Sequence, residues 1–271
     1  MRGFPLQFSP KKAKSFFRKS LGKHIVCPKC GFKKFVRKLK GKDKRYFCSS
    51  CRYKFSLKSM IGFKHSNLDY DQLYSLVWCF SQNKTVKDVI VWSEVSCMSA
   101  RDNYSRLRDR LSFKLDKNLI WGHFICDECF VGKQKTENQA IVAGAVSHDF
   151  QDLRLSIIPD RDQDSIEGFL HQNIKPSSLI TSDGLLSYSD IEWMGYGHDF
   201  EIHEKGEIKK TTPIERVWGL FKTFIMRTYH HIWKEKLQEY LVEFQVKFIH
   251  RKNIKNPLYL AKMLHSSVPN S

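Results

Sequence analysis

Two pairs of cysteines near the N-terminus restrict the fold of this chain more than any other feature. One C-x-x-C pair ends at Cys30, and a second begins at Cys48 after seventeen intervening residues. Two tight turns that each offer two thiolates can close a tetrahedral site around one zinc ion. The sequence therefore predicts a zinc ribbon over residues 24–64, folded largely by its metal, with the ligands Cys27, Cys30, Cys48 and Cys51. A core of free thiols is the alternative.

Positive charge is concentrated in the same part of the chain. The formal net charge is +18 over 271 residues, and the first 64 residues hold 20 Lys and Arg against one acid. Such density is typical of a surface that binds a polyanion. We expect the ribbon to contact a nucleic-acid backbone through Lys33, Lys34, Arg37, Lys38, Lys40 and Arg45. Residues 1–23 are expected to be a flexible basic segment, because they are rich in Lys, Ser and Pro.

Residues 65–117 show the spacing of three short helices. Apolar side chains recur at helical intervals after Asp69, after Thr85 and from about Ser99. The last helix is rich in arginine, including Arg101 and Arg106. A helix-turn-helix-like DNA-binding segment explains this pattern. A helical linker with a solvated basic face explains it equally well.

Residues 118–271 alternate between strand and helix patterns and predict one mixed α/β domain with a central sheet. The expected strands are residues 120–131, 140–146, 153–158, 178–181 and 198–203, and the expected helices are 164–174, 213–227 and 234–248. The chain shows no apolar run long enough for a membrane span and no secretory signal pattern, so we expect a soluble protein in a reducing compartment.

The stretch "CDEC" at 126–129 falls within the first expected strand. Side chains alternate between the faces of a strand, so Cys126 and Cys129 point to opposite faces and cannot form a metal knuckle. Asp127 and Glu128 diverge in the same way, and only one of them can face a given cleft.

A carboxylate binds a catalytic cation only together with other ligands, and two further acids are candidates. Asp183 follows the fourth expected strand, and Glu215 lies in the next helix. Glu215 has a second interpretation, because Thr212 as N-cap and Glu215 at N3 would form a capping box. Both roles stay open. Lys222 lies two turns beyond Glu215 on the same face, with Gly219 between them.

These residues belong to a recognisable series of motifs. The run "ERVWGLFKTFIMRTYHHIWKEKLQEYLVEFQVKFIHRKN" at 215–253, with "DECFVG", "TSDGLLSY", "HEKGE" and the N-terminal "CPKCG" and "FCSSCRYKFS", resembles the Merlin superfamily of DDE transposases and its bacterial insertion-sequence relatives. The resemblance implies a ribonuclease-H-like core after the zinc ribbon and helical segment. It assigns Asp127, Asp183 and Glu215 as catalytic ligands of Mg²⁺ or Mn²⁺. Relatives often carry Asn-Gly where this chain has Thr212-Pro213, which shifts the third role toward Glu215 and also admits an inactive copy.

The function implied by the resemblance is DNA transposition. The protein would bind terminal inverted repeats, cleave a strand and transfer it to target DNA by cation-dependent phosphoryl transfer. Lys222 is expected to approach the DNA, and a homodimer or larger assembly is expected on DNA. The compartment would be the cytoplasm of a bacterium or the nucleus of a eukaryote, without a membrane partner. An inactive zinc-ribbon DNA-binding protein and a metal-dependent nuclease on the same core are the alternatives.

Overall fold

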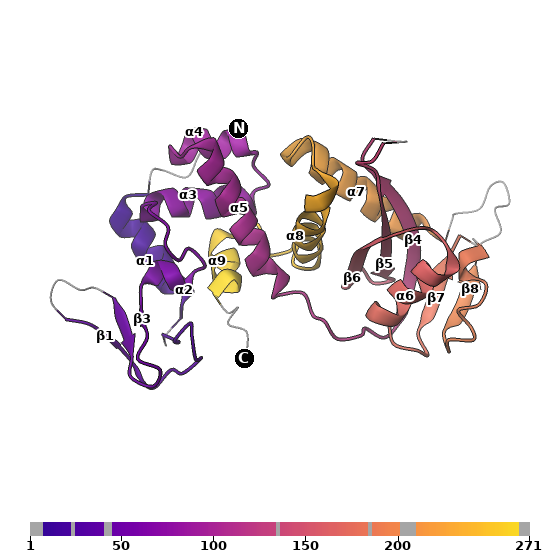
Figure 1. Cartoon of the computed structure of the whole chain (residues 1–271), viewed down its shortest axis with the longest axis horizontal. Helices are drawn as coiled ribbons and strands as arrows, with labels where there is room; N and C mark the ends of the chain where they lie inside the picture. Colours follow the sequence, from indigo (N-terminus) through magenta and orange to yellow (C-terminus); the bar gives the residue numbers. More distant parts are fainter. Residues whose placement is uncertain are drawn as a thin grey trace. The chain divides into compact units, whose positions relative to one another are not determined.

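The chain divides into two compact units (Figure 1). The computed structural model describes residues 8–22, 25–40, 45–133, 136–183, 186–200 and 210–265. Residues 1–114 and 250–271 form one unit, and residues 115–249 form the other. The first holds 31 Lys and Arg against 7 Asp and Glu, and the second holds 15 against 21. We call them the basic unit and the sheet unit.

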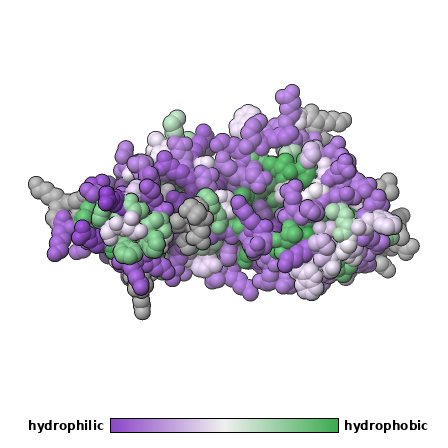
Figure 2. Space-filling view, turned by 60° about the horizontal axis from the view of Figure 1, so that its bottom comes forward, coloured by the Kyte–Doolittle hydropathy of each residue, from purple (hydrophilic) through white to green (hydrophobic). Residues whose placement is uncertain are grey.

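Hydrophilic side chains cover most of the face drawn in Figure 2, with smaller hydrophobic areas between them. No helix in the described ranges is long and apolar enough to cross a membrane.

The basic unit begins with a helix that its composition does not predict. Residues 1–23 are expected to be flexible, but α1 (Pro10–Ser20) buries Ala13 and Phe17, and the hydroxyl of Ser9 accepts a hydrogen bond from the N–H of Lys12 at its start. Its lysines lie on the exposed side. The helix therefore has an apolar face that anchors it, and it packs against α3 and α9.

A small antiparallel sheet and four helices complete the N-terminal part of the basic unit. The sheet has the order β1-β2-β3. The elements are β1 (Val36–Lys38), β2 (Tyr46–Cys48), β3 (Lys54–Phe55), α2 (Leu57–Met60), α3 (Tyr70–Ser81), α4 (Val86–Ser93) and α5 (Cys97–Ser112). Asp69 and Thr85 each form a capping box, at the starts of α3 and α4 respectively. These caps explain why the two helices begin where they do.

The last helix of the chain belongs to the basic unit. The sequence pattern places residues 118–271 in one domain, whereas the structure assigns residues 250–271 to the unit that contains the N-terminus. The reason is α9 (Pro257–His265), which buries Leu260, Ala261 and Leu264 and packs against α1, α3 and α5. The sheet unit is therefore an insertion between two parts of the basic unit.

The sheet unit contains one five-stranded mixed sheet in the order β6-β5-β4-β7-β8. The first three strands are antiparallel, and β4, β7 and β8 are parallel. The strands are β4 (His123–Val131), β5 (Ala140–Ser147), β6 (Leu153–Ile158), β7 (Leu179–Ser182) and β8 (Gly197–Phe200). This is the predicted ribonuclease-H-like mixed sheet, and the predicted fold class is confirmed. The expected extension of the fifth strand to residue 203 lies outside the described residues.

Helices cover both faces of the sheet (Figure 1). One face packs against α7 (Thr212–Thr228) and α8 (Leu237–Ile249), with the short 3-10 helix η2 (Lys234–Lys236) before α8. The other face packs against α6 (Gln163–Asn173) and the residues around the 3-10 helix η1 (Leu186–Tyr188). Each face has its own apolar core, and successive residues of β4 supply the two cores in turn.

Candidate functional site

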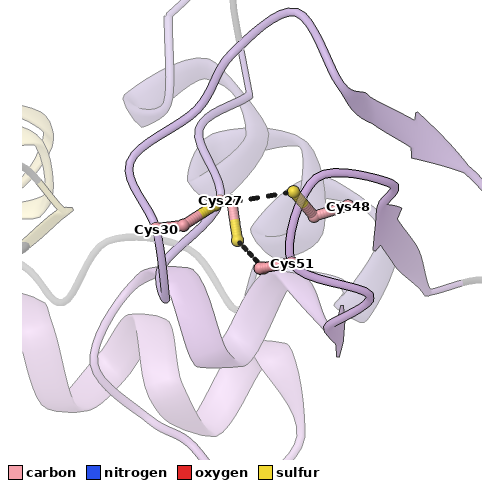
Figure 3. Close-up of side chains that lie close together, drawn as sticks. All are labelled: Cys27, Cys30, Cys48 and Cys51. Carbon is pink, nitrogen blue, oxygen red and sulfur yellow. Dashed lines mark hydrogen bonds between the residues drawn. The ribbon is translucent and has the colours of Figure 1, made fainter.

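The four predicted zinc ligands lie together in the ribbon (Figure 3). The Sγ atoms of Cys27, Cys30, Cys48 and Cys51 all lie within 4.8 Å of one another. The distance from Cys27 Sγ to Cys51 Sγ is 3.5 Å, and that from Cys30 Sγ to Cys48 Sγ is 3.6 Å. Sulfur ligands 2.3 Å from a tetrahedral zinc ion are separated by about 3.8 Å. The cluster therefore has the donor set and the spacing of a zinc site.

The two cysteine turns have the same backbone geometry. The N–H of Cys27 donates to the carbonyl of Phe32 at 3.0 Å, and the N–H of Cys48 donates to that of Tyr53 at 2.9 Å. The residue after the second cysteine has positive φ in each turn, Gly31 at 73° and Arg52 at 55°. The backbone N–H of Phe32 lowers the pKa of the Cys30 thiol to about 7, whereas burial raises the pKa of the Cys27 and Cys51 thiols. A lower pKa favours the thiolate, which is the form that binds metal.

The "CDEC" stretch divides between the two faces of the sheet, as its alternation predicts. Cys129 belongs to the core under α7 and α8, whereas Cys126 belongs to the core under α6. Asp127 also faces α7, because its Oδ2 accepts a hydrogen bond of 3.0 Å from the indole Nε1 of Trp218. Asp127 is thus the acid of this stretch that faces the helix carrying Glu215.

Glu128 lies on the opposite face and fastens two other segments to β4. Its carboxylate accepts hydrogen bonds from the hydroxyl of Tyr188 at 2.6 Å and from Nε of Arg161 at 3.0 Å. The Glu128 side chain is only 1% exposed. Tyr188 follows Asp183 by five residues, so Glu128 holds the segment after Asp183 against the strand that carries Asp127.

Asp127 and Asp183 belong to neighbouring parts of the sheet. Strands β4 and β7 are parallel neighbours, with Ile125 level with Thr181. Continuing this register by two residues puts Asp127 beside Asp183. Burial raises the pKa of Asp127 to about 6, the charges of Glu128 and Asp183 raise it further, and hydrogen bonds from the N–H groups of Glu128 and Trp218 oppose the shift. Two carboxylates held side by side in this way suit a divalent cation with oxygen ligands.

Glu215 lies in the first turn of α7 and is exposed. It precedes Trp218 by three residues, so it lies one helical turn from the side chain that contacts Asp127. Within the described residues, the carboxylates of Asp127, Asp183 and Glu215 do not form a cluster of ligand atoms within 4.8 Å. The strand register therefore places Asp183 level with Asp127, and Glu215 lies one helical turn from Trp218, the residue that contacts Asp127.

The capping-box interpretation of Glu215 is wrong. Helix α7 begins one residue earlier than the pattern suggests, with Thr211 as N-cap, and among the described atoms this N-cap side chain makes no capping hydrogen bond. Glu215 is then at N4 rather than N3.

Lys222 lies on the same side of the sheet as Asp127. It is exposed on α7, and its ammonium group is close enough to the Cys129 thiol to oppose the rise in the pKa of that thiol that burial causes. Cys129 and Asp127 face the same side of β4. Lys222 therefore lies near Cys129, two residues beyond Asp127 on the same face of β4.

The sequence alone does not predict that Trp218 contacts Asp127, or that a glycine lies under its indole ring. Gly144 of β5 is the register partner of Asp127. A Cβ atom at Gly144 would lie 2.5 Å from Cη2 of Trp218. Glycine therefore makes room for the indole ring to lie over β5 and reach Asp127. The short "IVAGAVS" strand contains this glycine, but its partner lies far away in the sequence.

We predict that Gly144→Ala destabilises the sheet unit by about 1–3 kcal/mol, because the added methyl group overpacks against the indole ring. Urea unfolding followed by circular dichroism measures this change. Gly168→Ala is the matched control, since an added Cβ in this α6 position meets nothing within 4 Å. The control is expected to be neutral or more stable than wild type. Equal stability of Gly144→Ala and wild type would contradict the close packing of Trp218.

Helices α4 and α5 of the basic unit have a helix-turn-helix arrangement. Glu94 ends α4 in the left-handed conformation at φ 51°, Val95 is buried, and Ser96 caps α5. Helix α3 packs against both. At the start of α5, Met98 is 74% exposed and Arg101 is exposed, so this end of the helix is presented to solvent.

The arginines of α5 do not share one environment. Arg108 is buried, and the side chain of Arg110 packs against Gly62. Arg106 is exposed, and its Nη1 lies 3.5 Å from the carbonyl of Lys64. Arg101 is therefore the member of the series best placed on the outer face near the N-terminus of α5. The basic ribbon residues predicted to bind DNA are also exposed, namely Lys33, Lys34, Arg37, Lys38, Lys40 and Arg45.

The sheet order β6-β5-β4-β7-β8, with helices on both faces, is that of the predicted ribonuclease-H-like domain. Residues 127–248 match the family model of the ISXO2-like transposase domain. The predicted resemblance to DDE transposases is thereby confirmed for this part of the chain. Among solved structures, the chain is similar to the catalytic core domain of BIV integrase, with 13% identity, a TM-score of 0.30 and coverage of 52% of this chain and 80% of that chain. Comparison with curated proteins gave no significant match.

Proposed function

We propose that this chain is a DNA transposase that binds transposon ends and performs divalent-metal-dependent strand cleavage and strand transfer. The proposal is supported mainly by the positions of Asp127, on β4, and Asp183, directly after the parallel neighbour β7, both inside the region that matches the transposase domain. Zinc in the cysteine cluster is the proposed structural metal, and Mg²⁺ or Mn²⁺ is the proposed catalytic one.

The proposed catalytic ligands are Asp127, Asp183 and Glu215. These carboxylates would hold divalent cations, which would supply activation of the attacking oxygen and stabilisation of the leaving 3′ oxygen in an in-line displacement. The residues of this chain orient that site. Trp218 holds one oxygen of Asp127, and Glu128 fixes the segment after Asp183 to the same strand. Lys222 lies on the Asp127 side of the sheet, where its positive charge favours the approach of a phosphate.

The basic unit is the proposed DNA-binding part. Its excess of 24 positive charges contrasts with an excess of 6 negative charges on the sheet unit. A positive surface of this kind attracts DNA without regard to sequence. The exposed N-terminal end of α5, with Arg101, is the element proposed to read bases in the major groove. Joining two transposon ends requires two active sites, so a homodimer or larger complex on DNA is part of the proposal.

Cleavage of duplex DNA taken from both flanks of the reading frame tests this proposal. Wild-type protein is expected to nick these ends when Mg²⁺ or Mn²⁺ is added but not when neither is present, and to join the freed 3′ ends to a target plasmid. Glu215→Gln should reduce cleavage by more than about 100-fold, since loss of a metal ligand exceeds the effect of losing a supporting contact. Glu235→Gln, an exposed acid in η2 of the same unit, is the control and should cleave normally.

The alternatives give different results in the same assay. Binding without cleavage by wild-type protein indicates an inactive DNA-binding copy. Cleavage that ignores end sequence and is not followed by joining indicates a nuclease. Full activity of Glu215→Gln shows that another group provides the third ligand.

A further inference from the structure

A basic groove lies between α1 and the ribbon. It has a volume of about 450 Å³ and is lined by side chains from four parts of the basic unit. Helix α1 contributes Lys11, Lys14 and Arg18, and the ribbon contributes Lys38 and Arg45. None of the described residues that line the groove is acidic. Five cations around one groove repel each other, and an anion in the groove would relieve that repulsion.

The three cations of α1 are spaced so that they lie in a line along the groove. Lys11, Lys14 and Arg18 are three and four residues apart, so they form one stripe along the helix. The stripe is about 10 Å long at the helical rise, which corresponds to about three nucleotides along one DNA strand. Ala13 and Phe17 anchor the opposite face of α1 in the core of the unit. The three cations are therefore presented on a fixed scaffold rather than on a mobile tail.

Aromatic side chains line the groove and contact lysines at its edge. The Nζ of Lys14 lies 5.5 Å from the centre of the Tyr70 ring, and the Nζ of Lys58 lies 5.6 Å from the same ring. Tyr70 and Tyr46 both line the groove. These contacts restrict Lys14 to the groove side of α1.

We propose that this groove binds the phosphate backbone of duplex DNA. Residues of α1 would contact the backbone on one side, and residues of the ribbon would contact it on the other. The inference depends on the proposed function only in taking DNA as the polyanion. It assigns backbone contacts to Lys11, Lys14 and Arg18, and it joins them to Lys38 and Arg45 in a single site. Contacts to phosphates position the DNA without reading its sequence, so the groove would fix the register in which α5 meets the bases.

The test compares two double variants of the same helix by binding to a 30-base-pair duplex of arbitrary sequence, in buffer without added Mg²⁺ or Mn²⁺ and without chelator, so that the ribbon keeps its zinc. Lys11→Gln/Lys14→Gln removes two groove cations, and Lys12→Gln/Lys19→Gln removes two exposed cations that do not line the groove. The slope of log affinity against log salt should fall by about 1.8 for the groove variant, which corresponds to a roughly 30-fold loss of affinity at 0.15 M salt. The control variant should change the slope by less than about 0.5.

Two further measurements make the result decisive. Lys11→Arg/Lys14→Arg should keep the wild-type salt slope, and all variants should retain the zinc content and melting temperature of the wild type. Equal slopes for the groove and control variants would overturn the proposal, because charge alone rather than its position would then set affinity.

Displacement of the duplex by an equal charge concentration of polyglutamate in wild type but not in the groove variant would also overturn it, in favour of an acidic protein partner. Since the assay needs no cleavage, its outcome is independent of catalytic activity.

Discussion

Asp127→Asn is expected to abolish metal-dependent cleavage and yet to unfold at a higher temperature than the wild type when no Mg²⁺ or Mn²⁺ is added. The asparagine side chain can still accept the hydrogen bond from Trp218, but it cannot supply a negative charge to a cation. At the same time it removes a buried carboxylate whose pKa is raised to about 6 by burial and by neighbouring acids. Loss of function and gain of stability are therefore predicted from the same substitution.

The pH dependence follows from the direction of that shift. The folded state holds a proton on Asp127 more tightly than the unfolded state, so the wild type loses stability as pH rises from about 4 to about 6. The difference between Asp127→Asn and wild type should be small below pH 4 and should reach about 1–3 kcal/mol above pH 6. Thermal unfolding across this range measures it.

Magnesium provides the matching control. Added Mg²⁺ should raise the melting temperature of the wild type but not that of Asp127→Asn, because the cation binds the folded wild type. Cys126→Ser, next in the chain and facing the opposite core, should keep both the Mg²⁺ effect and the cleavage. An Asp127→Asn protein that still cleaves in Mg²⁺ would remove Asp127 from the active site.

The second large effect concerns the ribbon. Cys48→Ser is expected to bind no stoichiometric zinc and to lose the fold of residues 25–55, because a structural zinc site in so small a segment contributes about 10–16 kcal/mol of binding free energy. Cys97→Ser is the matched control: this cysteine is exposed in the same unit and lies outside the cluster. Elemental analysis and limited proteolysis measure the two changes.

One zinc per chain is expected for the wild type and for Cys97→Ser. Full zinc content in Cys48→Ser, or a ribbon that resists proteolysis after complete removal of metal, would show that the thiols are a core rather than a metal site.

Local pattern in the sequence was sufficient for much of the fold. Alternation in β4 correctly separates Cys126 from Cys129, because a strand fixes the direction of each side chain regardless of its partners. The spacing of the ribbon cysteines likewise reflects two local turns. The order of strands and helices is also local, since each element shows its own period.

Features that depend on distant partners were not predictable in the same way. The burial of Phe17 in α1 depends on α3 and α9, and without them a segment rich in Lys resembles a flexible tail. The contact between Trp218 and Asp127 joins residues 91 positions apart, and it needs Gly144 beneath the ring. The start of α7 was misplaced by one residue, because Thr211 and Thr212 are equivalent N-cap candidates in sequence.

The position of α9 after the sheet unit in the sequence determines the order in which the two units can fold during translation. A ribosome finishes the whole sheet unit before it makes the helix that completes the basic unit, and domains generally fold as units as they emerge. The sheet unit can then fold on a growing chain, whereas α1, α3 and α5 wait for Leu260 and Leu264 to cover them. The basic unit is thus the first to be started by the ribosome and the last to be completed. A chain that stops after residue 249 has a basic unit without α9.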